Sequence, residues 1–197
     1  MILLWDLLGT FVFCLSGALA GKQTEMDIYG MFVAGLVTGT GGGALRSVLI
    51  GDVPPAIFTI PHYFIVAALA TLLAYCLEPF FLKMTRAVSF FDALGLGFFV
   101  CLGVRTGQVH ELPWWSCTAM GVITATFGGV IRDIIRNEVP LVFRREIYAT
   151  ACIIGGLILI GLDLMGVQNS LAMAIATFSV ALIRILAIRY AINQSHA

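Results

Sequence analysis

Long apolar stretches separated by short polar connections make up almost the whole chain. Seven stretches can be placed, interrupted mainly by Gly, Ser and Thr, at about residues 2–21, 28–50, 61–82, 89–106, 114–136, 147–165 and 169–190. A helix needs about 20 consecutive apolar residues to cross a bilayer. Since backbone polar groups in lipid must be satisfied within their own segment, the stretches predict helices rather than open strands. The pattern predicts an all-α integral membrane protein with seven transmembrane helices.

One sequence pattern occurs twice, 86 positions apart and without a gap, as Asp6–Pro54 and again as Asp92–Pro140. Internal repeats in a membrane chain are typical of two structural copies around a shared translocation path. We expect one copy over about residues 1–82, a second over about 89–165 and an additional helix over about 169–190. The shared positions favour glycine and include Gly9/Gly95, Gly17/Gly103, Gly35/Gly121, Thr38/Thr124, Gly42/Gly128, Gly43/Gly129 and Arg46/Arg132.

Each copy holds an odd number of spans, which fixes how the copies face. With three spans in each, the second copy enters the membrane from the opposite side, so the two copies are inverted relative to each other. The fold prediction is therefore an inverted 3+3 repeat plus a seventh helix, in a single transmembrane domain that covers residues 1–197.

Basic residues fall almost entirely on one side of this predicted topology. The positive-inside rule then places the N-terminus outside and the C-terminus in the cytoplasm. On the opposite side only Arg105 lies near a connection. Arg144 and Arg145 form a basic pair suited to anionic lipid headgroups, with a purely topological role as the alternative. The residues on the cytoplasmic side are Lys22, Lys83, Arg86, Arg136, Arg144, Arg145 and Arg189.

Composition agrees with a membrane protein and argues against several other classes. Of the 197 residues, 60% are hydrophobic and 11% are charged, with a mean hydropathy of +1.00, whereas a soluble domain has about 25% charged residues. No basic run indicates nucleic acid binding. The histidines are scattered and the five cysteines lack CxxC spacing, so we expect buried, unreactive cysteines and neither a metal site nor a cofactor. Without a nucleophile–base pair or an HExxH pattern, no enzymatic activity is expected.

Consecutive glycines lie near the middle of the second and fifth stretches, as Gly41, Gly42 and Gly43 and as Gly128 and Gly129. Each glycine costs a helix about 1 kcal/mol relative to alanine, and it permits a kink or a short unwound stretch. Unwound backbone at membrane depth survives only beside protein or a water-filled cavity. We therefore expect breaks here that line a central pathway, with close helix packing as the alternative.

An arginine follows each glycine run. A charged residue in a span costs at least about 2.5 kcal/mol and usually faces water or a partner. Arg46 and Arg132 lie about seven residues beyond the midpoints of their spans, or about 10 Å along the helix. Inversion sends Arg46 toward the outer half of the membrane and Arg132 toward the inner half. We expect Asp133 to pair with Arg46 across the symmetry axis, because adjacent helix residues do not face each other. The alternative to a role in the pathway is that both arginines are locked in ion pairs or bonded to helix-end carbonyls.

Other polar residues in the spans have two interpretations each. Ser16, Thr38 and Thr124 either line the path or bond the backbone of their own helix. Asp6 and Asp92 open their helices, where the helix dipole favours an acid, so we expect them to cap.

At these residues the sequence resembles the trimeric intracellular cation channel (TRIC) family, in its prokaryotic branch. The resemblance is carried by Gly41–Arg46, by Gly128–Asp133 and by the Asn137–Pro140 stretch that follows, and it covers essentially the whole chain. The doubled glycine–arginine motif is specific, whereas either copy alone is weak. The first copy departs from the pattern of many bacterial members, because Ser47 follows Arg46 where those members have an aspartate.

The resemblance implies a homotrimer in a bacterial or archaeal inner (plasma) membrane, with a pore inside each protomer and helices 2 and 5 kinked at the glycines. It implies permeation of monovalent cations, potassium or sodium, with potassium preferred. A similar bacterial branch is linked to the uptake of small amino acids, glycine in particular.

Two functions therefore remain as alternatives. A cation channel is favoured by the resemblance, although two arginines near the waist repel cations unless they are paired. A small amino acid (glycine) transporter is favoured by the inverted repeat and by arginines that can hold a carboxylate. The residues alone do not separate the two, and the resemblance favours the channel.

Overall fold

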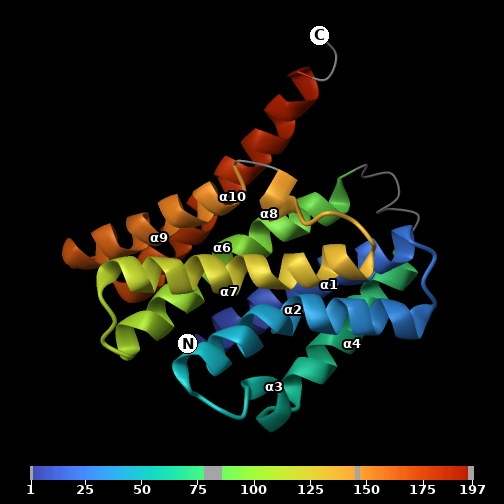
Figure 1. The fold of residues 1–197 in the computed structure, drawn as a ribbon, viewed down its shortest axis with the longest axis horizontal. Helices are drawn as coiled ribbons and strands as arrows, with labels where there is room; N and C mark the ends of the chain where they lie inside the picture. The colour runs from blue at the N-terminus through green and yellow to red at the C-terminus, as the bar shows by residue number, and fades with distance from the viewer. Residues whose placement is uncertain (1, 78–85, 145–146, 195–197) are drawn as a thin grey trace.

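The computed structural model describes residues 2–77, 86–144 and 147–194, and every regular element within them is a helix (Figure 1). The first copy of the repeat supplies α1 (Ile2–Gln23), α2 (Ile28–Ile50), α3 (Ala56–Thr59) and α4 (His62–Cys76). The second supplies α6 (Ala87–Val109), α7 (Trp114–Ile135), α8 (Leu141–Arg144) and α9 (Ala149–Leu164), and α10 (Asn169–Gln194) follows. The order of two long helices, a single turn and a shorter helix thus occurs twice.

The prediction of an all-helical membrane protein is confirmed. Five described helices (α1, α2, α6, α7 and α10) are long and apolar enough to cross a bilayer, whereas α4 and α9 are apolar but have only 15 and 16 residues. The predicted third span ran to residue 82, and its last part lies outside the described residues. The count of seven spans remains a prediction.

Backbone conformation repeats along with the helices. Glu25 and Glu111 occupy the same position in the two copies, and their φ angles are 60° and 56°. Gly51 and Asn137 form a second such pair, with φ angles of 77° and 56°, just after α2 and α7. Left-handed backbone is costly for residues other than glycine and asparagine. Its recurrence at two matched positions indicates that the copies fold alike.

Helices α1, α2, α7 and α6 pack as a four-helix bundle in which each contacts the next, with α4 against the first copy and α9 and α10 against the second (Figure 1). Within each copy a glycine brings the first two helices close together. A Cβ on Gly17 would lie 2.6 Å from the carbonyl oxygen of Ala34, and one on Gly103 would lie 2.5 Å from that of Met120. Small residues at an interface let membrane helices approach each other in this way.

The glycine runs do not interrupt α2 or α7, because residues 28–50 and 114–135 are helical throughout. The predicted unwound stretch is therefore wrong for this structure, whereas a kink at the glycines remains a prediction. A Cβ on Gly42 would lie 1.9 Å from the carbonyl oxygen of Thr124, and one on Gly128 would lie 2.1 Å from that of Thr38. The two helices cross with their backbones in contact, so close packing, the alternative reading of the glycines, describes the arrangement. We call this contact the α2–α7 crossing.

The crossing also shows how the copies are oriented. Gly42 meets Thr124 while Gly128 meets Thr38, so residue numbers rise along α2 as they fall along α7. In the same way Gly9 meets Phe98 and Gly95 meets Phe13 between α1 and α6. The first two helices of each copy therefore run antiparallel to their counterparts, as an inverted repeat requires. The complete 3+3+1 arrangement within a bilayer remains a prediction.

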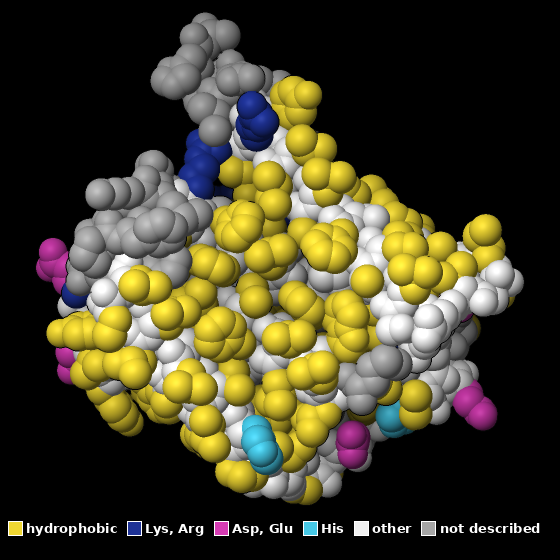
Figure 2. All heavy atoms as spheres, turned by 180° about the vertical axis from the view of Figure 1, so that it is seen from behind, with side chains coloured by type: hydrophobic (Ala, Val, Ile, Leu, Met, Phe, Trp, Pro, Cys, Tyr) yellow, Lys and Arg dark blue, Asp and Glu magenta, His cyan; other side chains and the backbone are white. Residues whose placement is uncertain are grey.

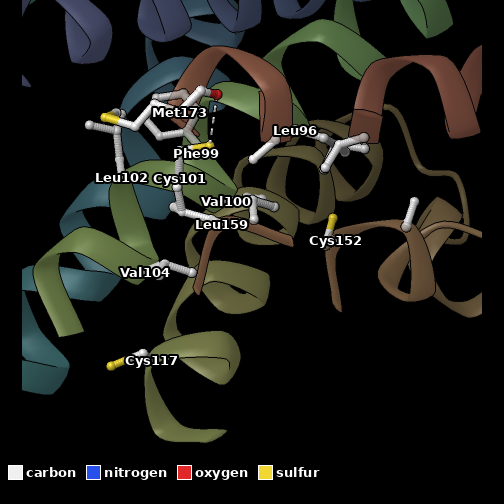
Figure 3. Packing of buried hydrophobic residues seen from close by; sticks show 14 of the residues in the cluster. Leu96, Phe99, Val100, Cys101, Leu102, Val104, Cys117, Cys152, Leu159 and Met173 are labelled. Atoms are coloured by element: carbon white, nitrogen blue, oxygen red, sulfur yellow. Dashed lines mark hydrogen bonds between the residues drawn. The ribbon is translucent and has the colours of Figure 1, made fainter. Parts of the chain in front are cut away.

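An apolar core joins the second copy to α10 (Figure 3). Leu96, Val100, Leu159 and Met173 are fully buried there, and the Cys101 thiol donates to the carbonyl oxygen of Met173 at 3.5 Å. Four of the five cysteines are buried as expected, whereas Cys76 is exposed on α4. The additional helix is thus part of the packed bundle.

Hydrophobic side chains cover most of the face opposite to that of Figure 1 (Figure 2). Leu171, Phe178 and Leu182 of α10 are more than half exposed. Basic side chains on this face gather toward the end where the C-terminal part of α10 projects. An apolar surface of this extent suits contact with lipid.

We expect Gly42→Ala and Gly128→Ala to destabilise the protein by about 1–3 kcal/mol, because the added methyl group overpacks the α2–α7 crossing. Gly161→Ala on α9 is the matched control, since a Cβ there has no neighbour within 4 Å. That change should gain up to about 1 kcal/mol of helix stability. Denaturant unfolding in detergent micelles, followed by circular dichroism, measures the differences. Equal midpoints for the crossing and control variants would contradict the backbone contact.

Candidate functional site

A buried ion-pair cluster surrounds Arg132 near the C-terminal end of α7. Its guanidinium donates from Nη1 to Asp92 Oδ1 at 2.6 Å and to Ser16 Oγ at 3.0 Å, and from Nε to Asp133 Oδ1 at 2.9 Å. Arg132 and Asp92 are only 1% and 0% exposed, so water does not solvate the positive charge of the guanidinium. A buried charge is stable only when it is paired and hydrogen-bonded, and two carboxylates provide that here.

Neighbouring elements fix this cluster from several sides. The Tyr148 hydroxyl donates to Asp92 Oδ1 at 3.2 Å, and the backbone N–H of Leu141 donates to Asp133 Oδ2 at 3.0 Å. Arg184 of α10 lies over the Tyr148 ring, 4.7 Å from its centroid, and donates to the carbonyl oxygen of Ile147 at 2.6 Å. We call Arg132, Asp92, Asp133, Ser16 and Tyr148 the Arg132 cluster.

Arg46 lies at the equivalent position of the first copy, but it lines a pocket. Asp6 faces the same pocket and accepts a hydrogen bond from the Tyr63 hydroxyl. Nη1 of Arg46 and Oγ1 of Thr10 are buried without a hydrogen-bond partner. We call this space the Arg46 pocket; it is lined by Asp6, Thr10, Gly39, Thr40, Gly43, Ala44, Arg46, Ala56, Ile57, Tyr63 and Phe99.

The Arg46 pocket and the Arg132 cluster contain the same types of residue from equivalent helices, and they differ in one acidic residue. Each has an arginine from its second helix, an aspartate from its first helix and a tyrosine that donates to that aspartate. Ser47 stands where the second copy has Asp133. Among the described residues, Arg46 forms no ion pair. The first site therefore has one carboxylate for its arginine, whereas the second has two.

The structure corrects two expectations about the acids. Asp133 pairs with its neighbour Arg132 and not with Arg46, because the long arginine side chain bends back toward the adjacent carboxylate. Asp6 and Asp92 do not cap, since α1 begins at Ile2 and α6 at Ala87, which places both acids inside their helices.

Sequence reasoning missed Tyr63, Tyr148 and Arg184. The shared Asp6/Asp92 pair was a signal for the two sites. The tyrosines gave a weaker signal because they are not at matched positions.

The remaining predicted site residues take separate places. Thr38 and Thr124 donate to the carbonyl oxygens of Ala34 and Met120 at 2.6 and 2.7 Å, so they bond their own helices. The five glycines lie in three places. Gly42 and Gly128 lie at the crossing, and Gly41 lies beside Ile131. Gly43 lines the Arg46 pocket, and Gly129 lies against Tyr148. Arg144 is exposed on α8, and Arg145 lies outside the described residues.

The α2–α7 crossing separates the two arginine sites. Arg46 and Arg132 each follow the glycine at the crossing by four residues, or about one helical turn. Because α2 and α7 run antiparallel, the two turns lead to opposite sides of the crossing. The bundle thus carries a polar site on each side of the α2–α7 crossing, and the site around Arg132 is fully buried.

Comparison with known proteins agrees with this geometry. A family model described as "Glycine transporter" matches residues 3–79 and 89–163, one match for each copy. A UPF0126 membrane protein of Vibrio cholerae is 35% identical over 195 residues, which cover 96% of this chain and 80% of the relative. The UPF0126 inner membrane protein YadS of Escherichia coli K12 is 38% identical over 160 residues, covering 80% of this chain and 77% of the relative.

Solved structures are similar over nearly the whole chain. The TRIC trimeric intracellular cation channel orthologue from Rhodobacter sphaeroides superposes with a TM-score of 0.90 at 32% identity, covering 96% of this chain and 98% of that one. A prokaryotic TRIC channel crystallised in 0.5 M KCl gives a TM-score of 0.90 at 29% identity and 97% coverage of both chains.

The helical bundle and its two buried arginine sites define a multi-pass membrane protein with the TRIC fold. Since the family model matches both of its copies, the chain belongs to the Glycine transporter family.

We expect Asp92→Asn to cost about 3 kcal/mol of stability, because it leaves Arg132 buried with one carboxylate fewer. Asp163→Asn is the control: Asp163 pairs with Arg105 at 2.6 Å, but the two side chains are 22% and 13% exposed. That partly exposed pair should contribute only about 1 kcal/mol. Unfolding in detergent micelles compares the two variants. Equal losses of unfolding free energy in the two variants would show that burial does not determine how much the Arg132 cluster contributes to stability.

Proposed function

We propose that this protein is a channel for monovalent cations, with potassium preferred over sodium and a pore inside each protomer. The observation that carries the proposal is the pair of polar sites buried on opposite sides of the α2–α7 crossing. An all-apolar bundle would need no such groups, and charged residues inside a membrane mark ion or substrate pathways. Similarity to solved TRIC cation channels over more than 95% of the chain supports the same function.

The formal charge of the Arg132 cluster favours cations over anions. Arg132 is outnumbered by Asp92 and Asp133 in the buried cluster, which leaves one net negative charge if all three are ionised. Acidic groups lining a pore select cations. The arginine that first counted against a cation channel is therefore neutralised by its own neighbours.

Opening requires α2 and α7 to separate at their crossing, where the backbones leave no room for an ion. We propose that Gly41, Gly42 and Gly43 and their counterparts Gly128 and Gly129 allow the helices to kink in the conducting state. The carbonyl groups of Thr38 and Thr124, now in contact with the opposite glycines, would then face the pathway. Arg46 and the Arg132 cluster, including Ser16 and Asp133, flank this gate.

Small amino acid transport is the second candidate, and the description of the family model favours it. Antiparallel copies with a polar site in each also match transporters that alternate access. The channel ranks first because the similar solved structures are named cation channels. As a channel, the protein would be no enzyme.

Potassium current from purified protein in a planar bilayer tests the proposal. The purified protein should first show by light scattering the mass of a trimer, as the name of the Rhodobacter sphaeroides relative suggests. Under asymmetric KCl the current should reverse near the potassium equilibrium potential. Replacing most of the chloride by gluconate, at constant potassium concentration, should leave the reversal potential unchanged. Saturable glycine uptake into liposomes, without conductance, would replace the channel with the transporter.

We propose that the protein lies in the inner membrane, as YadS does by name, with its N-terminus outside and Arg144 near cytoplasmic lipid headgroups. The positive-inside distribution supports this orientation. In a bacterial host, green fluorescent protein fused to the C-terminus should fluoresce, because it folds in the cytoplasm. Alkaline phosphatase in the same position should be inactive, and an active phosphatase would reverse the topology.

A further inference from the structure

The Arg46 pocket has an arginine, an aspartate and a tyrosine arranged as in the Arg132 cluster, but it lacks the second carboxylate of that cluster. In the second copy, Asp133 supplies that carboxylate and is fixed by the backbone N–H of Leu141. In the first copy the equivalent residues are Ser47 and Pro55. Serine has no charge, and proline has no N–H to hold one. Within residues 2–77, 86–144 and 147–194, no second acid therefore pairs with Arg46.

Space is left where the missing group would go. A Cβ on Gly129 would lie 2.7 Å from the Tyr148 hydroxyl, whereas one on Gly43 would meet only Arg46 Nη2, at 3.8 Å. The lining of the first site is also more polar at one matched position. Thr10 corresponds to Leu96 of the second copy.

Two hydrogen-bond donors in this pocket lack an acceptor. Nη1 of Arg46 and Oγ1 of Thr10 are both buried and unpaired, and Thr10 is 0% exposed. An unsatisfied buried polar group is costly and points to a ligand, an ion or water. Because one of the two donors is cationic, an anion satisfies this pair better than a neutral acceptor does.

We propose that the Arg46 pocket binds a small carboxylate, of the size of acetate or glycine. The Arg46 guanidinium would pair with the carboxylate and the Thr10 hydroxyl would donate to it, while Ile57 and Phe99 contact its aliphatic part. With Asp6 and acetate ionised, the occupied pocket has the same formal charge as the Arg132 cluster, whereas zwitterionic glycine would leave the pocket neutral. Asp6 is directed to the Tyr63 hydroxyl, which reduces its repulsion of the ligand.

Binding itself does not depend on conduction, but its consequence rests on the proposed function. In a cation channel, a carboxylate on Arg46 would neutralise the positive charge on the outer side of the crossing. Cation current should then rise as the pocket fills. In a transporter the same site would hold the carboxylate of the substrate.

Saturation-transfer NMR on the full chain in nanodiscs measures binding directly, with sodium acetate, glycine and methylammonium chloride as separate probes. Acetate and glycine should bind saturably to the wild type, and methylammonium should not compete with them. Arg46→Gln should weaken acetate binding at least about tenfold, as expected for the loss of a charge-assisted bond. Arg136→Gln is the matched control, because Arg136 pairs with Glu138 outside the pocket, and it should bind acetate as the wild type does.

Ser47→Asp provides a second test that retains Arg46. This substitution gives the first copy an aspartate at the position equivalent to Asp133. The carboxylate of that residue should take the place of the ligand and abolish acetate binding. Circular dichroism and gel filtration show whether each variant is folded. Unchanged acetate affinity in folded Arg46→Gln, or binding of methylammonium in place of acetate, would overturn the proposal. Acetate binding without potassium current would refute the channel and leave the site standing, whereas current without acetate binding would refute the site alone.

Discussion

The backbone contact between α2 and α7 is the constraint on which the rest of the structure depends. Only glycine fits at positions 42 and 128, because any Cβ would lie within about 2 Å of a carbonyl oxygen of the other helix. The contact joins one copy of the repeat to the other and fixes their antiparallel register. It also sets where the two arginines lie, since each follows its glycine by one helical turn. A change at the crossing would therefore move both polar sites together.

The Arg132 cluster adds specificity to this packing. Glycine contacts and apolar surfaces tolerate small shifts, whereas a buried guanidinium needs its acceptors in place. Ser16 of α1, Asp92 of α6 and Asp133 of α7 meet at Arg132, and Tyr148 links the group to Arg184 of α10. Elements of both copies and the additional helix are thus held in one arrangement. This contact adds to the apolar core that holds α10 in the bundle although α10 lies outside the repeat.

Much of the fold could be predicted from the sequence, because apolar length and the repeat are local and periodic signals. The stretch at 28–50 matches α2, and that at 114–136 exceeds α7 by one residue. The role of the glycines could not be predicted, since glycine both loosens a helix and lets another approach, and only the facing helix decides. The partner of Asp133 was wrong for a related reason: spacing along a helix describes where side chains start, not how far a flexible arginine bends. Tyr63 and Tyr148 were missed because their sequence offset differs by one residue from that of the repeat.

The unequal sites bear on the choice between channel and transporter. An inverted-repeat transporter alternates access when each copy takes up the conformation of the other. For this chain, that exchange would close the first site around Arg46 as the second is closed around Arg132. The first copy has Ser47 in place of the second acid, so the exchanged state would lose a charge-assisted hydrogen bond of about 1.5–3 kcal/mol. By itself the chain is therefore biased toward one arrangement, with α2 and α7 in contact at the crossing and the fixed Arg132 cluster on one side. Such a bias suits a channel, which needs only to open and close, better than a carrier that must populate two mirrored states.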